Sequence, residues 1–572
     1  MGRLKKYISP YLGYMILTMA IKLLGAYTEL MIPDLMETII DKKVPAKDQQ
    51  SIYLYGGLML LCAFLCLVFN VVANRMSAKS SGKITRAIRH DLFNKLEHLS
   101  ARQMDDLTIS SAESRLTSDT YNINQMLARL QRMGIRAPML LIGGMIMMLR
   151  MDAVLSLVLI SLLPIIALVT YFVTKKSLPL YTKQQTVLDK VVRTVQENIT
   201  GIRVIKALSK TDYEKKRFHT VNSELTQIDQ KAGTVSALTN PTASLTLNLG
   251  LTLVVLVGAY RVNNGQMEGG VIVAFLQYFT MILNAMLGVT RIFVMWSKGE
   301  ASAKRVADVL DTPDDMAVLP QTEAESNGSH IEFKNVSFSY TGIGTNTSDL
   351  SFRLERGQTL GILGPTGSGK STIINLLMRL YDTDDGQVLI DGRDIRTIPY
   401  NELRSKFGVV FQNDFVMEGS IADNLRFFRQ VSDEDITAAA AHAQAEFIAY
   451  KEGGMDAEVQ VRGNNLSGGQ KQRLLIGRAL AAKPEILILD DASSALDYRT
   501  DAKLRQALRE HYRDTTTVLV AQRISSLRHA DLILVLQEGA VIGMGNHETL
   551  MQTCEEYAYL ARIQMGEGQE VL

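Results

Sequence analysis

The chain has 572 residues, of which 47% are hydrophobic and 21% are charged. Its 61 Lys and Arg residues against 59 Asp and Glu residues give a net charge of +2, which argues against a strongly basic nucleic-acid-binding protein. The mean hydropathy of +0.06 exceeds that of a typical soluble protein of this size, so we expect lipid-facing surface. Three cysteines are too few for a disulfide framework.

Six apolar runs in the first half are long enough to cross a bilayer, which needs roughly 20 residues for each helix. The segments 74–133 and 175–243 between them are long, helical in composition and rich in Lys and Arg, which places both segments and both termini in the cytoplasm. The sequence therefore predicts an α-helical membrane domain of six long transmembrane helices over 1–320, with these segments as cytoplasmic extensions. The apolar runs lie at 11–38, 51–73, 134–150, 153–174, 244–262 and 269–292.

Each cytoplasmic extension is expected to be a helix pair joined by a turn that can press on a cytoplasmic domain and transmit motion. Candidate turns lie near Asp105–Leu107 and Thr211–Glu214. The polar, turn-forming residues 311–315 and 322–329 predict a linker. We place the domain boundary there, with a second, α/β domain over 321–572.

The second domain carries a phosphate-binding motif. Residues 360–363 predict a buried strand and 372–380 a helix, and the loop between them reads G-x-x-x-x-G-K-[ST]. Its glycines let backbone N–H groups surround phosphate oxygens, while Lys370 is expected to reach the β- and γ-phosphates of a nucleotide and Ser371 to ligate Mg²⁺. The loop and the residue after it are Gly364, Pro365, Thr366, Gly367, Ser368, Gly369, Lys370, Ser371 and Thr372.

Two further motifs accompany this loop. The apolar residues 486–489 predict a strand that ends in Asp490, whose carboxylate can hold Mg²⁺. Between the two strands the chain reads Leu-Ser-Gly-Gly-Gln at 466–470. This combination resembles the ATP-binding cassette (ABC) transporters. Six apolar runs followed by one such P-loop α/β cassette resemble a half-transporter of the ABC exporters, over nearly the whole chain.

The resemblance implies further site residues. Tyr340 matches the aromatic residue that stacks on adenine, and Gln412 matches the loop glutamine that meets Mg²⁺ and the membrane helices. Two cassettes pair head to tail in this family, so one subunit's signature segment contacts the ATP of the other. The residues implied to contact the partner's ATP are Ser467, Gly468, Gly469, Gln470 and Asp497. The resemblance also implies a bacterial inner-membrane location, a cytoplasmic nucleotide-binding domain and export of amphipathic compounds.

Two positions depart from the pattern of an active hydrolase. Most family members carry Glu where this chain has Asp491, and His where it has Gln522. Asp draws the carboxylate back by one carbon–carbon bond, and a misplacement of about 1 Å can cost roughly a hundredfold in rate. Gln can donate a hydrogen bond but cannot become cationic. The chain thus resembles the degenerate-site subunit of a heterodimeric bacterial exporter, which binds ATP, hydrolyses it slowly and completes the active site of a second, non-identical half-transporter.

Four residues are candidates for a substrate cavity. Lys22 and Glu29 lie two turns apart on one face of the first apolar run, and charges inside membrane runs are often functional. Phe275 and Tyr278 in the sixth run suit a hydrophobic small molecule. The alternatives are that the charges snorkel or pair with neighbours, and that the aromatic residues pack against lipid.

Other functions fit parts of the pattern. The chain could form a homodimer in which Asp491 and Gln522 still work, it could export lipids or peptides, or ATP could gate a membrane regulator without pumping. The apolar runs argue against a soluble cassette ATPase of DNA repair. An importer is disfavoured because importers usually carry membrane and cassette domains on separate chains.

Overall fold

The computed structural model describes the backbone of residues 4–320, 328–342, 344–412 and 414–565. The chain divides into two compact units. One unit comprises the chain up to Glu97 and the segment Ser110–Thr312, and the other joins His98–Ile109 to the chain after Pro313. The linker expected at 322–329 lies mainly outside the described residues.

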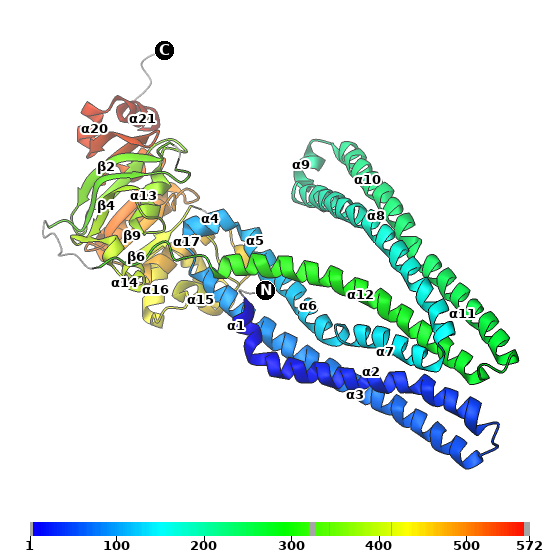
Figure 1. Cartoon of the computed structure of the whole chain (residues 1–572). Coiled ribbons are helices and arrows are strands. Elements are labelled where there is room, and N and C mark those ends of the chain that lie inside the picture. The colour runs from blue at the N-terminus through cyan, green and yellow to red at the C-terminus, as the bar shows by residue number, and fades with distance from the viewer. Residues whose placement is uncertain (1–3, 321–327, 343, 413, 566–572) are drawn as a thin grey trace. The chain divides into compact units, whose positions relative to one another are not determined.

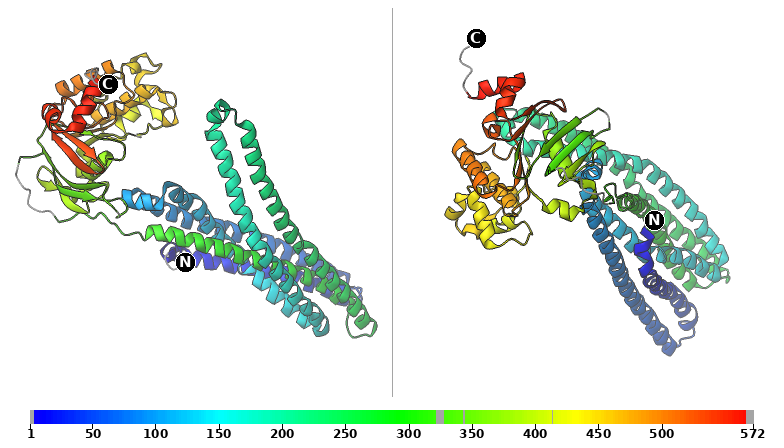
Figure 2. Two further views of the ribbon diagram at one scale, coloured as in Figure 1. Left: turned by 90° about the horizontal axis from the view of Figure 1, so that it is seen from above. Right: turned by 90° about the vertical axis from the view of Figure 1, so that its left-hand side faces the viewer.

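The regular elements in the described residues of the first unit are all helices. Helix α2 packs along α3, α12 packs along α6 and α7, and α8 pairs with α10 and α11. In Figures 1 and 2, α8, α9 and α10 form a long arm that diverges from the bundle containing α3, α6 and α12. The helices are α1 (Lys5–Ile8), α2 (Leu12–Thr38), α3 (Gln49–Glu97), α5 (Ile109–Ser114), α6 (Thr120–Met133), α7 (Arg136–Met151), α8 (Ala153–Thr200), α9 (Ile202–Ala207), α10 (Thr211–Ala237), α11 (Thr239–Asn263) and α12 (Gly269–Leu310).

Five helical segments in the described part of the chain are long and apolar enough to cross a membrane. They coincide with five of the six predicted runs. The remaining run, 153–174, begins α8, where the described apolar stretch is Ala153–Leu162 and several later side chains are not described. The count of six therefore stays a prediction. The five segments are Lys5–Lys43, Gln49–Glu97, Ile109–Met151, Ser244–Asn263 and Gly269–Met286.

The structure places a break between helices within a few residues of each predicted cytoplasmic turn. Residues 105–107 belong to helix α4 (Ala101–Leu107). That helix begins with a capping box, in which the Ser100 hydroxyl accepts a hydrogen bond from the Gln103 backbone N–H at 3.2 Å. Residues 211–214 form the first turn of α10, where Asp212 and Glu214 favour a helix N-terminus, and the helices are joined just before it, at 208–210.

The second unit contains two larger sheets. A six-stranded sheet has the order β12-β11-β3-β10-β9-β6, parallel except for β12, and a four-stranded antiparallel sheet has the order β2-β1-β4-β5. The predicted strands at 360–363 and 486–489 are confirmed. The strands are β1 (Ile331–Phe338), β2 (Thr347–Leu354), β3 (Thr359–Leu363), β4 (Asp385–Ile390), β5 (Arg393–Asp394), β6 (Phe407–Val410), β7 (Gly419–Ser420), β8 (Glu458–Val459), β9 (Ile486–Asp490), β10 (Thr516–Val520), β11 (Leu532–Gln537) and β12 (Ala540–Gly545).

Helices cover these sheets and complete two hydrophobic cores. One core joins both larger sheets to α13 through Phe333, Ile362 and Ile373, and the other joins α15, α16 and α17 to β9 through residues such as Ile476 and Leu489. Helix α13 confirms the helix predicted after the P-loop. The helices are α4, α13 (Lys370–Leu377), α14 (Tyr400–Ser405), α15 (Ile421–Arg426), α16 (Asp433–His442), α17 (Gly468–Leu480), α18 (Tyr498–His511), α19 (Ile524–Leu527), α20 (His547–Thr553) and α21 (Glu555–Met565).

Helix α4 is attached to the second unit by hydrogen bonds. The Tyr381 hydroxyl donates to Asp105 Oδ2 at 2.5 Å, and the Ser100 hydroxyl donates to Asp315 Oδ2 at 2.7 Å. The Tyr381 ring also meets the Tyr340 ring edge to face, with centroids 5.0 Å apart. A chain of direct contacts therefore runs from α4 to the aromatic residue expected to stack on adenine.

Removing the Tyr381 hydroxyl tests this attachment. A hydrogen bond to a charged group contributes roughly 1.5–3 kcal/mol. We expect Tyr381→Phe to raise amide hydrogen exchange in residues 101–107 about tenfold, since about 1.4 kcal/mol corresponds to a factor of ten. The matched control is Tyr559→Phe, at a side chain that is 65% exposed. Unchanged exchange in the Tyr381→Phe variant would contradict the attachment.

Candidate nucleotide-binding site

Parallel strands bring the functional segments to one edge of the sheet. Strand β10 lies between β3 and β9, and its Val520 pairs with Ile362 on one side and Asp490 on the other. The segments that follow these strands therefore emerge side by side, and ligands of open α/β sheets bind at such strand ends. They are the P-loop, the segment containing Asp491 and the segment containing Gln522.

A cavity of about 310 Å³ lies among these segments. Gly364, Pro365 and Ser368 complete the P-loop, although they are not among the lining residues. Sequence reasoning missed Asn346, whose side-chain oxygen accepts a hydrogen bond from the Tyr340 backbone N–H at 3.0 Å, because its loop carries no recognisable pattern. The predicted residues that line the cavity are Tyr340, Thr366, Gly367, Gly369, Lys370, Ser371, Thr372, Gln412, Asp490, Asp491 and Gln522.

The P-loop has the features of a phosphate cradle. Gly369 has a φ of +98°, and a Cβ there would lie 2.8 Å from the backbone oxygen of Asn346, so only glycine fits. The Ser368 hydroxyl is buried without a hydrogen-bond partner among the described residues. The Lys370 ammonium group donates to the backbone oxygens of Gly364 and Pro365, at 2.8 and 2.6 Å. These donors, at the N-terminus of α13, fit the phosphates of ATP.

The oxygen ligands expected for Mg²⁺ lie beside the loop. The Ser371 hydroxyl donates to Asp490 Oδ2 at 3.1 Å, and Gln412 lines the same cavity. Burial raises the pKa of the Asp490 carboxyl, while the bond from Ser371 acts in the opposite direction. Hydroxyl, carboxylate and amide oxygens are the kind of ligand that Mg²⁺ takes, so these residues fit the ion.

Both departures from the hydrolase pattern line this cavity. Asp491 has a φ of +51°, a backbone conformation that Asp adopts more readily than most residues, and its backbone N–H donates to Val520 at 3.0 Å. Burial raises the pKa of the Asp491 carboxyl, against the opposing charges of Arg523 and Lys370. Gln522, two residues after the end of β10, also lines the cavity. Asp491 and Gln522 therefore both lie beside this chain's own P-loop.

The signature residues do not line the cavity. Ser467 caps α17, its hydroxyl accepting from the Gln470 backbone N–H at 3.3 Å, and Ser467 and Gly468 are exposed. Asp497 caps α18 and accepts from the Thr500 backbone N–H at 2.9 Å, a bond that lowers the pKa of the Asp497 carboxyl. The remaining member of the set, Gly469, lies in the first turn of α17.

The four candidate substrate residues are not brought together. Glu29 pairs with Arg136 at 2.8 Å and lines a cavity of about 140 Å³ in the first unit. The Lys22 ammonium group instead donates to the side chain of Asn70 at 2.5 Å. Phe275 and Tyr278 are fully buried in the helical core rather than facing that cavity. Of the four candidate substrate residues, only Glu29 therefore lines this cavity.

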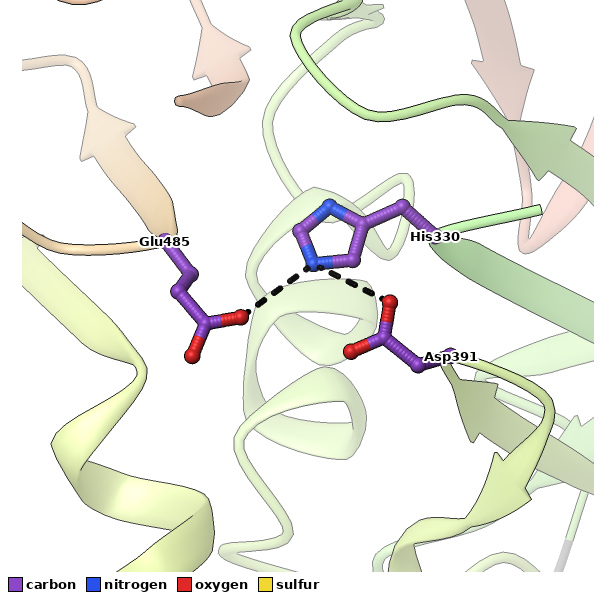
Figure 3. Close-up of side chains that lie close together, drawn as sticks. All are labelled: His330, Asp391 and Glu485. Carbon is purple, nitrogen blue, oxygen red and sulfur yellow. Dashed lines mark ion pairs between the residues drawn. The ribbon is translucent and has the colours of Figure 1, made fainter. Parts of the chain in front are cut away.

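A separate polar cluster lies in the second unit and does not line the nucleotide cavity (Figure 3). The buried His330 directs Nε2 between carboxylate oxygens of Asp391 and Glu485, at 3.8 and 3.9 Å. Arg356 and Lys406 pair with the same carboxylates, for example Lys406 with Glu485 at 2.9 Å. Two cations balance two anions, which is the arrangement of an ion-pair network and not of a metal site. Burial lowers the pKa of His330, which favours its neutral form.

Comparisons with known proteins agree with this geometry. Residues 15–286 match the ABC transporter transmembrane region, and residues 347–494 match the ABC transporter family. The uncharacterized ABC transporter ATP-binding protein YfiB of Bacillus subtilis is 33% identical over all of both chains. A fatty acid ABC transporter ATP-binding/permease protein of Mycobacterium bovis is 34% identical, over 83% of this chain and 75% of that protein.

A solved structure agrees over almost the whole chain. It is that of a bacterial Atm1-family ABC exporter with ATP bound, which superimposes with a TM-score of 0.81 and 26% identity over 98% of this chain and 99% of that one. The match of residues 347–494 to the ABC transporter family implies that the chain binds ATP. The chain belongs to the ABC transporter family, as a multi-pass membrane exporter subunit whose C-terminal cytoplasmic domain is an ATPase coupled to transport.

Proposed function

We propose that this chain is one half of a heterodimeric exporter that moves amphipathic compounds, including multiple drugs, out of the cell. One observation carries the proposal: Asp491 and Gln522 line the same cavity as the P-loop lysine, Lys370. The site on this chain then binds ATP but hydrolyses it slowly. Efficient hydrolysis takes place at a second site, whose P-loop, Glu and His belong to a non-identical partner.

Exposed residues support the need for a second subunit. The signature segment lies outside this chain's own cavity, where Ser467 and Gly468 are accessible. The end of the α8–α10 arm exposes apolar side chains, with Val204, Leu208 and Tyr213 each more than 60% exposed. Apolar surface gathered at the tip of a cytoplasmic extension is typical of an interface. A partner subunit that covers both surfaces accounts for their exposure.

The roles within the site are those that the resemblance implies, and the lining of the cavity is compatible with them. Tyr340 stacks on adenine, the P-loop and Lys370 hold the phosphates, and Ser371, Asp490 and Gln412 hold Mg²⁺. Two ATP molecules clamp the cassettes, and hydrolysis at the partner's site releases them. ATP at the degenerate site stays bound through several cycles. The α4 contacts transmit closure of the cassettes to the membrane helices.

A homodimeric lipid exporter is the second candidate. The relative from Mycobacterium bovis, named as a fatty acid transporter, favours it. The cavity at Glu29 and Arg136 is also compatible with amphipathic lipids, because Met133, Leu140 and Met281 add adaptable apolar surface to the ion pair. In this candidate Asp491 and Gln522 are working catalytic residues.

The composition of the native complex separates the two candidates. We expect the tagged chain, extracted gently from its host membrane, to have the mass of a pair with a different subunit of similar size. That subunit's sequence should carry Glu and His at the positions equivalent to Asp491 and Gln522. Native mass spectrometry measures this directly. A complex of two identical chains would refute the heterodimer and leave the homodimer.

Restoring the usual catalytic pair tests the degenerate site. We expect Asp491→Glu combined with Gln522→His to raise ATP hydrolysis at this site, because about 1 Å of carboxylate displacement can account for roughly a hundredfold. The measurement is turnover of the purified complex, with nucleotide trapping to identify which subunit hydrolyses. Asp514→Glu, an exposed conservative change, is the control. No gain in the double variant would refute the assignment.

Blocking the signature segment tests the head-to-tail arrangement. A Cβ on Gly468 meets only the Ala495 Cβ, at 3.8 Å, so Gly468→Asp brings its Cβ into no close contact within this chain. Its charge would repel the partner's γ-phosphate, and we expect turnover of the complex to fall about a hundredfold, as when a key transition-state donor is lost. Melting temperature and ATP binding at Lys370 should be unchanged. Gly233→Asp, in open space on α10, is the control, and equal turnover in both variants would exclude the arrangement.

A further inference from the structure

A second cavity of the C-terminal unit shares no lining residue with the ATP cavity. Its volume is about 300 Å³, and it forms between α18, the strands β9 and β10 and the segment 526–531. Its lining includes neighbours of the two residues that depart from the hydrolase pattern. Ala492 follows Asp491 directly, and Ser526 lies four positions after Gln522. Much of its wall is apolar, including Leu489, Leu504, Leu508 and Leu519.

Three arginines line this cavity at intervals of four residues. Arg505 pairs with Asp501 at 2.9 Å, whereas Arg509 and Arg513 form no ion pair within the described part of the chain. The other acidic residue in the lining, Asp531, already accepts the backbone N–H of Thr359 at 2.7 Å. The lining therefore carries three arginines against two carboxylates, an excess of one positive charge, next to an apolar wall.

A buried hydroxyl adds a specific polar group. Ser526 is only 6% exposed, lines the cavity and has no hydrogen-bond partner for its Oγ among the described residues. An unsatisfied buried hydroxyl is unfavourable, and a bound ligand that accepts its hydrogen bond can recover that cost. Burial and the charges of Arg509, Arg528 and Arg505 lower the pKa of His529, in agreement with a positive potential here.

We propose that this cavity binds a small amphipathic anion. The carboxylate or phosphate group of the ligand lies between the guanidinium groups of Arg509 and Arg513, its apolar part contacts the leucines, and Ser526 donates a hydrogen bond to it. The volume is at the lower end of ligand pockets, so the ligand is small.

Because the lining continues into the segments of Asp491 and Gln522, ligand binding and ATP binding are coupled, and such coupling is reciprocal. This proposal does not depend on which partner or substrate the exporter has.

Fluorine NMR of the full-length chain in detergent tests the site, with a non-hydrolysable ATP analogue in excess to occupy the P-loop. The probes are para-trifluoromethylbenzoate, para-trifluoromethylphenyl phosphate and the neutral para-trifluoromethylbenzamide. We expect at least one anion to bind about tenfold more tightly than the amide, because hydrogen bonds to charged groups are the stronger ones. The two anions distinguish a carboxylate from a phosphate ligand.

Charge variants locate the binding. Arg509→Gln with Arg513→Gln should weaken anion binding about tenfold or more, since two charge-assisted hydrogen bonds are lost. Lys503→Gln, an exposed change on α18 outside the lining, should leave it unchanged. The proposal is overturned if the amide binds as tightly as the anions. It is also overturned if the double variant binds the anion as tightly as the unmodified chain does.

A cavity-filling variant and a titration complete the test. Ser526→Leu places a larger apolar side chain in the cavity and should abolish binding. If that variant does not fold, the two arginine changes at exposed positions decide the question. Titrating the ATP analogue with and without the anion measures the coupling, and an identical affinity for the analogue in both titrations overturns the coupling.

Discussion

The parallel pairing of β3, β10 and β9 is the constraint on which the nucleotide site depends. Its register places Ile362, Val520 and Asp490 side by side, so three segments far apart in sequence emerge at one edge of the sheet. A slip of one residue in β9 would turn Asp490 away from Ser371, because successive side chains on a strand point to opposite faces. The buried hydrophobic runs that form these strands therefore fix the chemistry as well as the fold.

Contacts beyond the sheet connect this site to helix α4. Asp105 of α4 accepts from Tyr381, whose ring packs on Tyr340, and Asn375 of α13 donates to the Tyr340 hydroxyl at 3.0 Å. The aromatic residue assigned to adenine is therefore held from two sides, by the helix that follows the P-loop and by the residue that anchors α4. A ligand that shifts Tyr340 must also disturb one of these contacts, which gives a physical route for transmitting nucleotide binding.

The sequence predicted the parts of the structure that depend on local chemistry. The P-loop, its flanking strand and helix and the strand ending at Asp490 all have strong local signals, and the structure confirms these elements. The features that the sequence did not reveal depend on competing local signals or on distant partners. The acidic residues 105–106 resemble a turn, but the Ser100 capping box starts a helix before them. The burial of Phe275 and Tyr278 depends on neighbouring helices, and the Tyr278 hydroxyl donates to the backbone oxygen of Leu30 at 2.7 Å, which hydropathy alone cannot reveal.

The length of α12 has a mechanical consequence. At 42 residues the helix is about 63 Å long, roughly twice the thickness of the hydrocarbon core of a bilayer. A rigid rod of that length works as a lever. A tilt of about 10° around a pivot in the membrane moves an end that lies 40 Å away by roughly 7 Å, which exceeds the pitch of one helical turn. Small rotations among the packed helices are thus enlarged at the cytoplasmic end, without any helix having to unwind.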